Sequence, residues 1–345
     1  MQKMKFSFTT FGTIICLAFI LSIFAGWTTE RKILDPLSSW NDGPAKKAIK
    51  DFVHATTEKS SSGYVKPEDR IATFDQDGTL WVEHPLYGQL MYCFDRVPDL
   101  VAAKPALKEV EPFKTVMSGD REAISKLTMA DLEKIAGYTL SGMSEDQFTV
   151  QVRNWLAKAK DPRWKKAYPD LAYLPMLEVM HYLRDNGYKT YIVTGGGQDF
   201  VRVYSEGTYG VPPEQVVGSV GETEYVYDST AGTSSMMKLP KMLLNNDKGG
   251  KPQGIQLVLG KRPYAAFGNT AGDQQMLEYT TTGGGARLGM LVLHDDATRE
   301  YAYGPAQGLP DSKIGTFSQD LYDLAKKRGW IVISMKNDWK EIFKK

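Results

Sequence analysis

The stretch IATFDQDGTLW, residues 71–81, decides how the chain is interpreted. Its apolar first half is typical of a buried strand, and two aspartates, Asp75 and Asp77, follow at the end of that strand. A Gly-Thr pair then indicates a sharp turn. Carboxylates at the end of a buried strand raise the free energy of the folded state unless they are paired or used, because they are poorly solvated there. The stretch therefore predicts a functional site.

Downstream of this strand, strand and helix patterns alternate. An amphipathic helix is predicted over residues 175–187, between a proline at its start and a glycine at its end. This alternation predicts an α/β fold, a doubly wound parallel sheet with helices on both faces. In such sheets ligands bind beyond the carboxyl ends of the strands. The further predicted strands lie within residues 189–197, 214–220, 264–273, 288–296 and 329–335, with a hairpin at 222–236.

The interval between the first two predicted strands is too long for a simple connection. From Asp75 to Thr194 is 119 residues (194 − 75), whereas a βαβ unit needs about 30. Residues 82–170 are rich in helical patterns, including a capping box at Thr128 and Asp131. We therefore expect a helical cap at 82–170, inserted into a catalytic core formed by residues 70–81 and 171–345.

The first 69 residues are expected to stand outside that core. Residues 28–69 are predicted to be an extension and linker that contains one short helix. Residues 1–27 carry a lysine flank followed by an apolar run, which predicts a signal peptide or a membrane anchor with the catalytic part outside the cytoplasm. The expected location is therefore exported, either periplasmic or membrane-anchored.

Composition excludes some function classes. The chain has 42 basic and 41 acidic residues and a net charge of +1, so it lacks the electrostatic footprint of a nucleic-acid-binding protein. It has two cysteines, and Cys16 lies inside the apolar run. A chain cleaved after that run would retain only Cys93, so no intrachain disulfide is expected. No protein partner is predicted.

Three of the predicted strand ends carry polar groups that suit phosphoryl chemistry. Asp75 can attack phosphorus as a nucleophile, and Asp77 can protonate the leaving group and then activate water. The Thr194 hydroxyl and the open backbone at Gly195 and Gly196 suit phosphate oxygens. At a third strand end, oxygens four residues apart belong to Asn269 and Asp273. Hard oxygen ligands beside a phosphate imply Mg²⁺.

The motifs DQDGT, VTGG and GNTAGD, in this order with a lysine before the last, resemble those of the haloacid dehalogenase superfamily, and its phosphoserine-phosphatase-like branch most of all. The resemblance implies that Asp75 is the nucleophile and a magnesium ligand. It implies that Asp77 is the acid/base and gives the metal its backbone carbonyl. It assigns phosphoryl binding to Thr194 and the Gly195 amide, and it matches residues 82–170 to the superfamily's helical cap.

Two positions depart from the family pattern or leave it ambiguous. The family usually has an aspartate where this chain has Asn269, and an amide oxygen is a weaker ligand for a hard cation. Asp273 would then carry more of the metal, or metal affinity would be lower. The lysine is either Lys248 or Lys251. We favour Lys251, because it opens a predicted helix at the spacing that the family uses.

The expected function is a magnesium-dependent phosphomonoester hydrolase that forms an aspartyl-phosphate and acts on small esters, phosphoserine-like or head-group phosphomonoesters. The alternatives are a phosphotransferase or mutase of the same fold, and an exported binding protein weakened in catalysis by Asn269. Three further interpretations stay open. Glu83 could meet a substrate amine or form a solvated hinge. Trp81, Tyr87 and Tyr92 could form part of an aromatic cage or pack the cap. His294 could lie near the metal or on a polar edge.

Overall fold

The computed structural model describes residues 35–344, and the compact unit that it defines comprises Pro36–Lys345. A seven-stranded sheet forms its centre, in the order β4-β3-β2-β1-β5-β6-β7. Strand pairs are parallel except β3 with β4, which are antiparallel. The doubly wound α/β sheet is confirmed. The strands are β1 (Ile71–Phe74), β2 (Lys189–Gly197), β3 (Val216–Asp228), β4 (Thr233–Leu244), β5 (Ala265–Gly268), β6 (Leu288–Leu293) and β7 (Ile331–Ser334).

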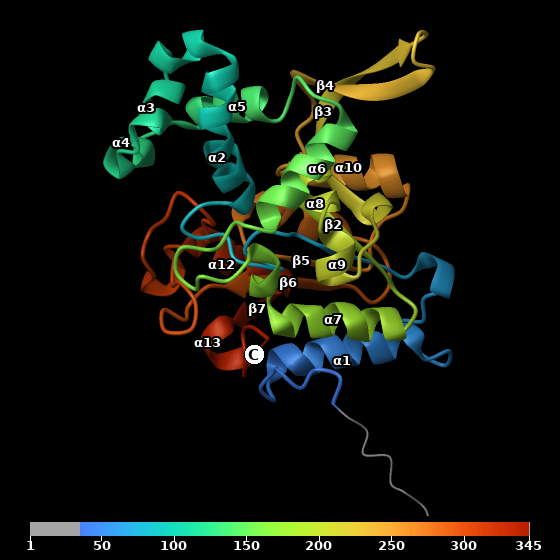
Figure 1. Cartoon of the computed structure of the whole chain (residues 1–345). Coiled ribbons are helices and arrows are strands. Elements are labelled where there is room, and N and C mark those ends of the chain that lie inside the picture. The colour runs from blue at the N-terminus through green and yellow to red at the C-terminus, as the bar shows by residue number, and fades with distance from the viewer. Residues whose placement is uncertain (1–34, 345) are drawn as a thin grey trace, which may run out of the picture. The chain divides into compact units, whose positions relative to one another are not determined.

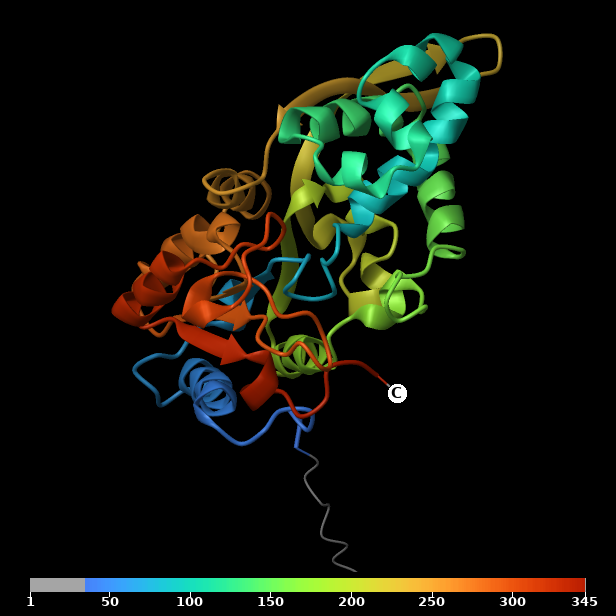
Figure 2. The same ribbon diagram turned by 90° about the vertical axis from the view of Figure 1, so that its left-hand side faces the viewer.

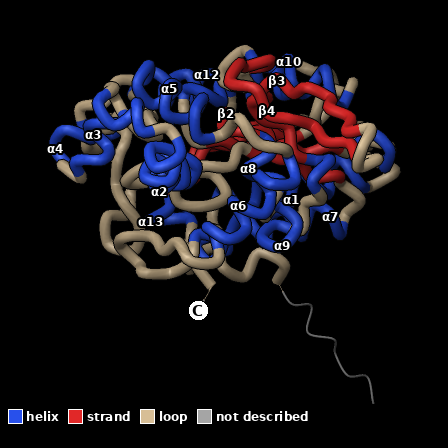
Figure 3. Tube along the Cα trace, turned by 45° about the horizontal axis from the view of Figure 1, so that its top comes forward, coloured by secondary structure: helices blue, strands red, loops and turns tan. Residues whose placement is uncertain are grey.

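Helices cover both faces of this sheet because apolar residues alternate between its two sides (Figure 3). In β5, for example, Ala265 and Phe267 face one apolar cluster and Ala266 faces the other. The first cluster includes α1 (Pro44–Thr57) and α7 (Leu174–Asp185), and the second includes α10 (Gly250–Leu259), α11 (Gln274–Thr281) and α12 (Gln319–Arg328). The result is a helix–sheet–helix sandwich that presents its strand ends at one edge.

The helix expected in the N-terminal extension belongs to the sandwich itself. Ile49 and Phe52 of α1 are buried in the same cluster as the sheet. Just before α1, Trp40 packs edge to face on Trp339, with 6.1 Å between the ring centroids. Residues from about 36 onward therefore help to build the core. Residues 1–34, with the predicted signal or anchor, lie outside the described residues, and no helix within 35–344 is long and apolar enough to cross a bilayer.

Between β1 and β2 the chain forms helices, and the capping box predicted for one of them is present at Thr128. Figures 1 and 2 show α3 to α5 in teal at the same end of the unit as the gold β3–β4 hairpin. The backbone N–H of Gly142 donates to the Lys238 carbonyl, which ties this segment to the hairpin. The helices are α2 (Gly88–Ala103), α3 (Phe113–Ser118), α4 (Arg121–Ser125), α5 (Met129–Thr139) and α6 (Glu145–Leu156).

The hairpin is longer than its sequence pattern indicates. The expected third strand and the first arm of the expected hairpin form one continuous strand, β3, from Val216 to Asp228. Its first residues are buried beside β2, and its last are exposed next to β4. The hairpin therefore extends the sheet toward the helices between β1 and β2. After β2 the chain continues through α8 (Gln198–Arg202) and α9 (Ser205–Tyr209), and α13 (Met335–Asp338) follows β7.

Candidate active site

Asp75 lies directly after β1, where its backbone N–H donates to the carbonyl of Phe267 in β5 at 2.8 Å. The Lys251 ammonium contacts it from α10: Nζ donates to Asp75 Oδ1 at 2.5 Å, to Asp273 Oδ1 at 2.6 Å and to the carbonyl of Val193 at 2.9 Å. All three donor positions of the ammonium are thus used. The structure brings together a carboxylate from one strand end, a carboxylate from another and a cation between them.

The charges of this group depend on one another. Burial raises the pKa of Asp75, the neighbouring Asp273 adds to that rise, and Lys251 opposes it. Burial alone would lower the pKa of Lys251, but the two carboxylates outweigh that effect and raise it. Lys251 therefore stays charged and favours the ionised, nucleophilic form of Asp75.

The other candidate lysine is not part of this group. Lys248 is exposed, with a left-handed backbone φ of 51°, and it does not line the cavity above Asp75. Lys251 occupies the second helical position of α10 and is 2% exposed. The structure therefore places Lys251 at the site.

Asp77 faces the same cavity as Asp75. Burial raises the pKa of Asp77 to about 6, whereas the indole N–H of Trp81, which donates to Oδ1 at 2.7 Å, and the nearby Lys251 both lower it. A carboxyl group with this pKa can hold a proton in mildly acidic solution and release it near neutrality. That range suits the acid/base role expected of Asp77.

The third part of the site is the end of β2. Thr194 is buried, and its hydroxyl oxygen accepts the N–H of Gly196 at 3.0 Å, which leaves the hydroxyl proton free to donate. The Gly195 carbonyl accepts from the Ser219 hydroxyl at 2.7 Å. These contacts fix the backbone that was expected to hold a phosphoryl group, and both Thr194 and these glycines line the same cavity as Asp75.

Gln89 is a residue of the site that no sequence motif indicates. Its Oε1 accepts the N–H of Gly197 at 2.8 Å, so a side chain from α2 reaches the glycine loop of β2. A Cβ atom at Gly197 would lie 2.8 Å from Gln89 Nε2, so a larger residue there would displace the end of this side chain. No local pattern could identify Gln89, because it lies 108 residues before its partner and within no motif.

Asn269 and Asp273 have different surroundings. Asp273 Oδ2 accepts the backbone N–H groups of Asn269 and Thr270 at 2.9 and 3.0 Å, while Oδ1 contacts Lys251. Asp273 thus orients the lysine and the turn. Asn269 Nδ2 donates to Glu83 Oε1 at 2.7 Å, and its Oδ1 accepts from the Thr79 hydroxyl at 3.2 Å.

The oxygens nearest a possible metal position fit Mg²⁺. The Thr79 hydroxyl lies 3.4 Å from Asp75 Oδ2 and 3.2 Å from Asn269 Oδ1, so oxygens from two strand ends adjoin the same hydroxyl. Within residues 35–344 no group of three or more His, Cys, Asp and Glu side chains is arranged to hold a metal. Mg²⁺ needs no such group, because it usually binds one or two carboxylates together with substrate phosphate and water. Asp75, Asn269 and the Asp77 carbonyl are the residues that would hold it. Asp273, which was also expected as a ligand, instead uses both carboxylate oxygens to accept from Lys251 and from backbone N–H groups.

Behind the site lies a buried polar network that sequence reasoning missed. Glu83 is 1% exposed, and its Oε1 also accepts from the Tyr303 hydroxyl at 2.8 Å. Burial raises the pKa of Glu83 well above its usual range. His294 contacts the Gly78 carbonyl through Nε2 at 2.7 Å and Glu300 through Nδ1 at 3.1 Å. Glu83 is therefore no solvated hinge and His294 is no exposed edge, since both support the turn after β1.

The aromatic cluster packs the structure. Trp81 is fully buried and stacks on Tyr204, with 4.7 Å between the ring centroids. Tyr92 is also fully buried, between Phe148 and Phe200. Neither ring is open to a ligand, so the aromatic-cage interpretation is wrong for Trp81 and Tyr92. Tyr87 is only partly buried and lines the cavity above Asp75.

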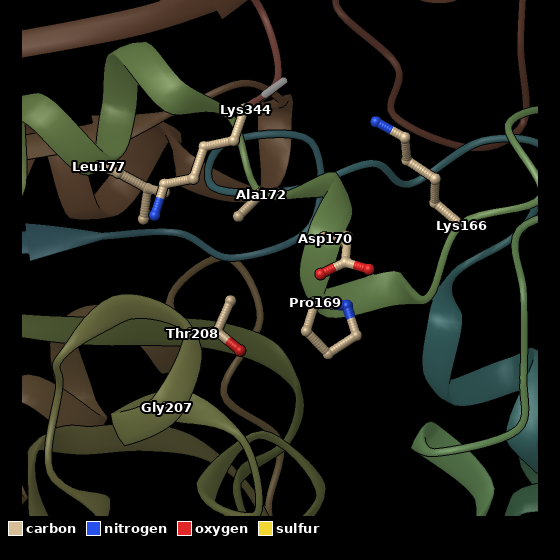
Figure 4. Close-up of a pocket in the computed structure, with 8 residues that line it drawn as sticks. All are labelled: Lys166, Pro169, Asp170, Ala172, Leu177, Gly207, Thr208 and Lys344. Atoms are coloured by element: carbon tan, nitrogen blue, oxygen red, sulfur yellow. The ribbon is translucent and has the colours of Figure 1, made fainter.

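A cavity of about 760 Å³ is lined by every predicted site residue except Asp273. It extends from the strand ends to α2, α5, α6 and the β3–β4 hairpin. A second cavity of about 520 Å³ lies elsewhere, lined by Lys166, Asp170 and Lys344 among others (Figure 4). None of the predicted catalytic or phosphate-binding residues lines it. The larger cavity is therefore the candidate active site.

The fold and the site together define an α/β protein with an aspartate pair and a lysine at the ends of parallel strands. Residues 72–278 match the family described as haloacid dehalogenase-like hydrolase, and the chain belongs to that family. The expected superfamily is confirmed.

Solved structures of similar fold share little sequence with this chain. A protein of unknown function from Anaerococcus prevotii DSM 20548 is 15% identical over 73% of this chain and 86% of its own, with a TM-score of 0.49. A protein of unknown function from Bordetella pertussis Tohama I is 15% identical over 76% and 97%, with a TM-score of 0.47. A phosphoserine phosphohydrolase-like protein from Francisella tularensis is 18% identical over 65% and 88%, with a TM-score of 0.35. Among curated proteins, none matches.

Proposed function

We propose that this protein is a magnesium-dependent phosphomonoesterase that works through an aspartyl-phosphate at Asp75. The observation that carries the proposal is the contact of Lys251 with Asp75 in a cavity that Asp77 and Thr194 also line. Lysine and a bound dication would offset the repulsion between an anionic ester and the carboxylates.

The reaction has two steps. An oxygen of Asp75 attacks phosphorus, the bond from phosphorus to the ester oxygen breaks, and Asp77 gives its proton to the departing alcohol. Asp77, now ionised, takes a proton from water as that water attacks the phosphorus, which releases inorganic phosphate and restores Asp75. Thr194 donates its hydroxyl proton to a phosphoryl oxygen throughout. Bound Mg²⁺ would supply Lewis-acid stabilisation of the phosphoryl oxygens.

The test is hydrolysis of p-nitrophenyl phosphate with MgCl₂ and with EDTA. Activity is expected with magnesium, and it should vanish in Asp75→Asn. A matched control is Asp320→Asn, at an exposed aspartate of α12 that does not line the cavity, and it should retain activity. Absence of turnover with every divalent metal would contradict the proposal and favour the binding-protein alternative.

Product analysis distinguishes the proposed hydrolase from the phosphotransferase alternative. With excess glycerol or another alcohol present, a hydrolase releases inorganic phosphate in proportion to the alcohol freed from the substrate. A transferase instead yields a new phosphate ester and less phosphate. Equal amounts of phosphate and freed alcohol are expected here.

We also propose that the protein acts outside the cytoplasmic membrane. The support is the lysine-flanked apolar run in residues 1–27. Fractionation of cells that make the full chain, followed by N-terminal sequencing of the product, tests both export and cleavage. Recovery of the uncleaved chain in the cytoplasm would contradict the proposal.

A further inference from the structure

Above the aspartates, the wall of the candidate active site is largely apolar. Side chains from different elements form it: Leu90 of α2, Leu132 of α5, Phe148 of α6, Phe200 of α8 and Leu239 of β4. The wall surrounds the space into which the leaving group of a phosphate ester would extend, because the phosphoryl group itself is expected at the strand ends. An apolar wall favours an apolar ligand through the area removed from water.

The one deeply buried cation of this wall is already neutralised. Lys238 Nζ contacts Asp199 at 2.5 Å and Glu145 at 3.1 Å, and it lies 4.6 Å from the centre of the Phe148 ring. The two other lysines of the upper wall, Lys241 and Lys313, are exposed. Among the described residues that line the cavity there is no arginine.

This charge distribution disfavours an acidic leaving group. The α-carboxylate of phosphoserine would enter the cavity with no unpaired buried cation to receive it, and burying an unpaired carboxylate is costly. The volume of about 760 Å³ also exceeds what serine would fill, since it lies in the range of sites for drug-sized ligands. Both observations concern the walls alone and are independent of the aspartates.

We propose that the natural leaving group is an uncharged alcohol with an apolar alkyl or aryl body much larger than serine. This inference rests on the proposed phosphomonoesterase activity. The phosphoryl group would bind at the ends of β1 and β2, and the apolar body would lie between α5 and the β3–β4 hairpin.

A series of n-alkyl phosphates from ethyl to octyl, with phosphoserine as the charged comparison, tests the inference. The value of kcat/KM should rise roughly three-fold per added methylene until the cavity is filled, and phosphoserine should fall below butyl phosphate. A flat series, or a preference for phosphoserine, would overturn the inference while p-nitrophenyl phosphate hydrolysis stayed intact. If wild type and Asp75→Asn were equally inactive on every ester, the proposed function would fail and this inference with it.

Two alanines of α5 give a matched pair of variants. Ala136 lines the cavity, whereas Ala130 lies on the same helix, is exposed and does not line it. Ala136→Phe should lower the ratio of kcat/KM for octyl phosphate to that for ethyl phosphate at least ten-fold, and Ala130→Phe should leave the ratio unchanged. Thermal melting of both variants controls for folding. An unchanged ratio in a folded Ala136→Phe would overturn the placement of the leaving group.

A second inference concerns Asn269 and rests on a different contact. Where its family usually has an aspartate, this chain has an amide whose Nδ2 donates to the buried carboxylate of Glu83 at 2.7 Å. This hydrogen bond fixes the orientation of the amide, so that Oδ1 points toward the Thr79 hydroxyl and hence toward Asp75. The carboxyl group that the family usually has at position 269 is therefore found here on Glu83, the residue that contacts Asn269.

We infer that Glu83 is a positioning residue for the metal site. Because Glu83 Oε1 accepts from Nδ2, the Asn269 amide keeps its Oδ1, and not its nitrogen, on the side of Asp75, where Mg²⁺ would bind. Groups that hold a metal ligand through a hydrogen bond typically change metal affinity 10–100-fold when mutated.

Removal of the acceptor tests this inference by direct binding. In Glu83→Met, Mg²⁺ affinity measured by calorimetry should fall at least ten-fold. In Glu83→Gln, whose amide oxygen can still accept from Asn269 Nδ2, affinity should stay within about three-fold of wild type. Adding Asn269→Asp to Glu83→Met supplies a ligand that needs no orientation by residue 83, and it should bring affinity back to within about three-fold of wild type.

A matched control is Glu300→Met, at an equally buried residue that contacts His294 and not Asn269. Its Mg²⁺ affinity should change less than about three-fold. Wild-type Mg²⁺ affinity in Glu83→Met, or no recovery in the double variant, would overturn the inference. Because the measured quantity is binding, this result is separate from whether any ester is hydrolysed.

Discussion

Lys251 is the residue on which the charge balance of the site depends. Its ammonium contacts two carboxylates that are themselves nearly inaccessible to water. In Lys251→Met these carboxylates lose their partner, so we expect the free energy of unfolding to fall by about 3–5 kcal/mol and activity to be lost. Urea unfolding and the p-nitrophenyl phosphate assay measure the two effects.

Lys248→Met is the control for that variant. Lys248 is exposed, so its substitution should change the free energy of unfolding by less than about 0.5 kcal/mol. If instead Lys248→Met abolished activity and Lys251→Met did not, the assignment of the lysine would be wrong.

Also at the residue scale, the proton of Asp77 should set the pH dependence. Burial raises the pKa of Asp77 to about 6, so its acid form is present below that pH and is lost as pH rises through it. For alkyl phosphates, whose leaving groups need a proton, kcat/KM should therefore decline as pH rises through about 6. For p-nitrophenyl phosphate, whose leaving group needs little help, the decline should be shallower.

The Trp81 indole gives a way to move that decline. Its hydrogen bond stabilises the ionised form of Asp77, so in Trp81→Phe the pKa of Asp77 should rise. The decline in kcat/KM for alkyl phosphates should shift upward by about half to one pH unit. Trp155→Phe, which removes a similar indole bond to Asp95 away from the site, should leave the profile in place.

At the scale of elements, Lys238 joins the β3–β4 hairpin to α6 and α8. It is 7% exposed and contacts Glu145 and Asp199. Lys238→Met leaves two partly buried carboxylates without their cation, so we expect the free energy of unfolding to fall by about 1–3 kcal/mol. Thermal and urea unfolding measure this loss.

Lys241 of the same strand is the matched control. It pairs with Glu222 but is exposed, and exposed ion pairs contribute between about 0 and 1 kcal/mol. An equal loss in Lys241→Met and Lys238→Met would mean that the buried pairs do not join the hairpin to the helices.

The hairpin also shows why the ends of a strand are harder to predict from sequence than its presence. Sequence alternation identified a strand near Val216 and a hairpin after it, but no local signal indicated that they form one strand. Continuity depends on pairing with β2 on one side and β4 further along. Such pairing is a property of the sheet, not of the segment.

At the scale of the whole molecule, residues near both ends of the described chain pack together in the core. Trp40, before α1, packs on Trp339, and its indole N–H donates to the Pro175 carbonyl at 3.0 Å. Trp40→Ala should lower the free energy of unfolding by about 3–5 kcal/mol, because it removes a large buried ring. Leu257→Ala, at a side chain 77% exposed on α10, should have little effect. A small effect of Trp40→Ala would show that residues 36–57 are not integral to the core.

By itself, the sequence determined the α/β class, the strands that end at Asp75, Thr194 and Asn269, and the chemistry that these residue types allow. It could do so because strand periodicity and turn residues are local, and because parallel strands bring their carboxyl ends to one edge.

Only the tertiary structure decided that Lys251 meets Asp75, that Gln89 reaches the glycines, and that Glu83 faces Asn269. These contacts join positions separated by 176, 108 and 186 residues, and no local pattern carries information over such distances. The walls of the cavity were likewise undetermined, because they come from helices and a hairpin that meet only in the folded chain. The chemistry of the reaction is thus visible in the motifs, while the nature of the alcohol is set by packing.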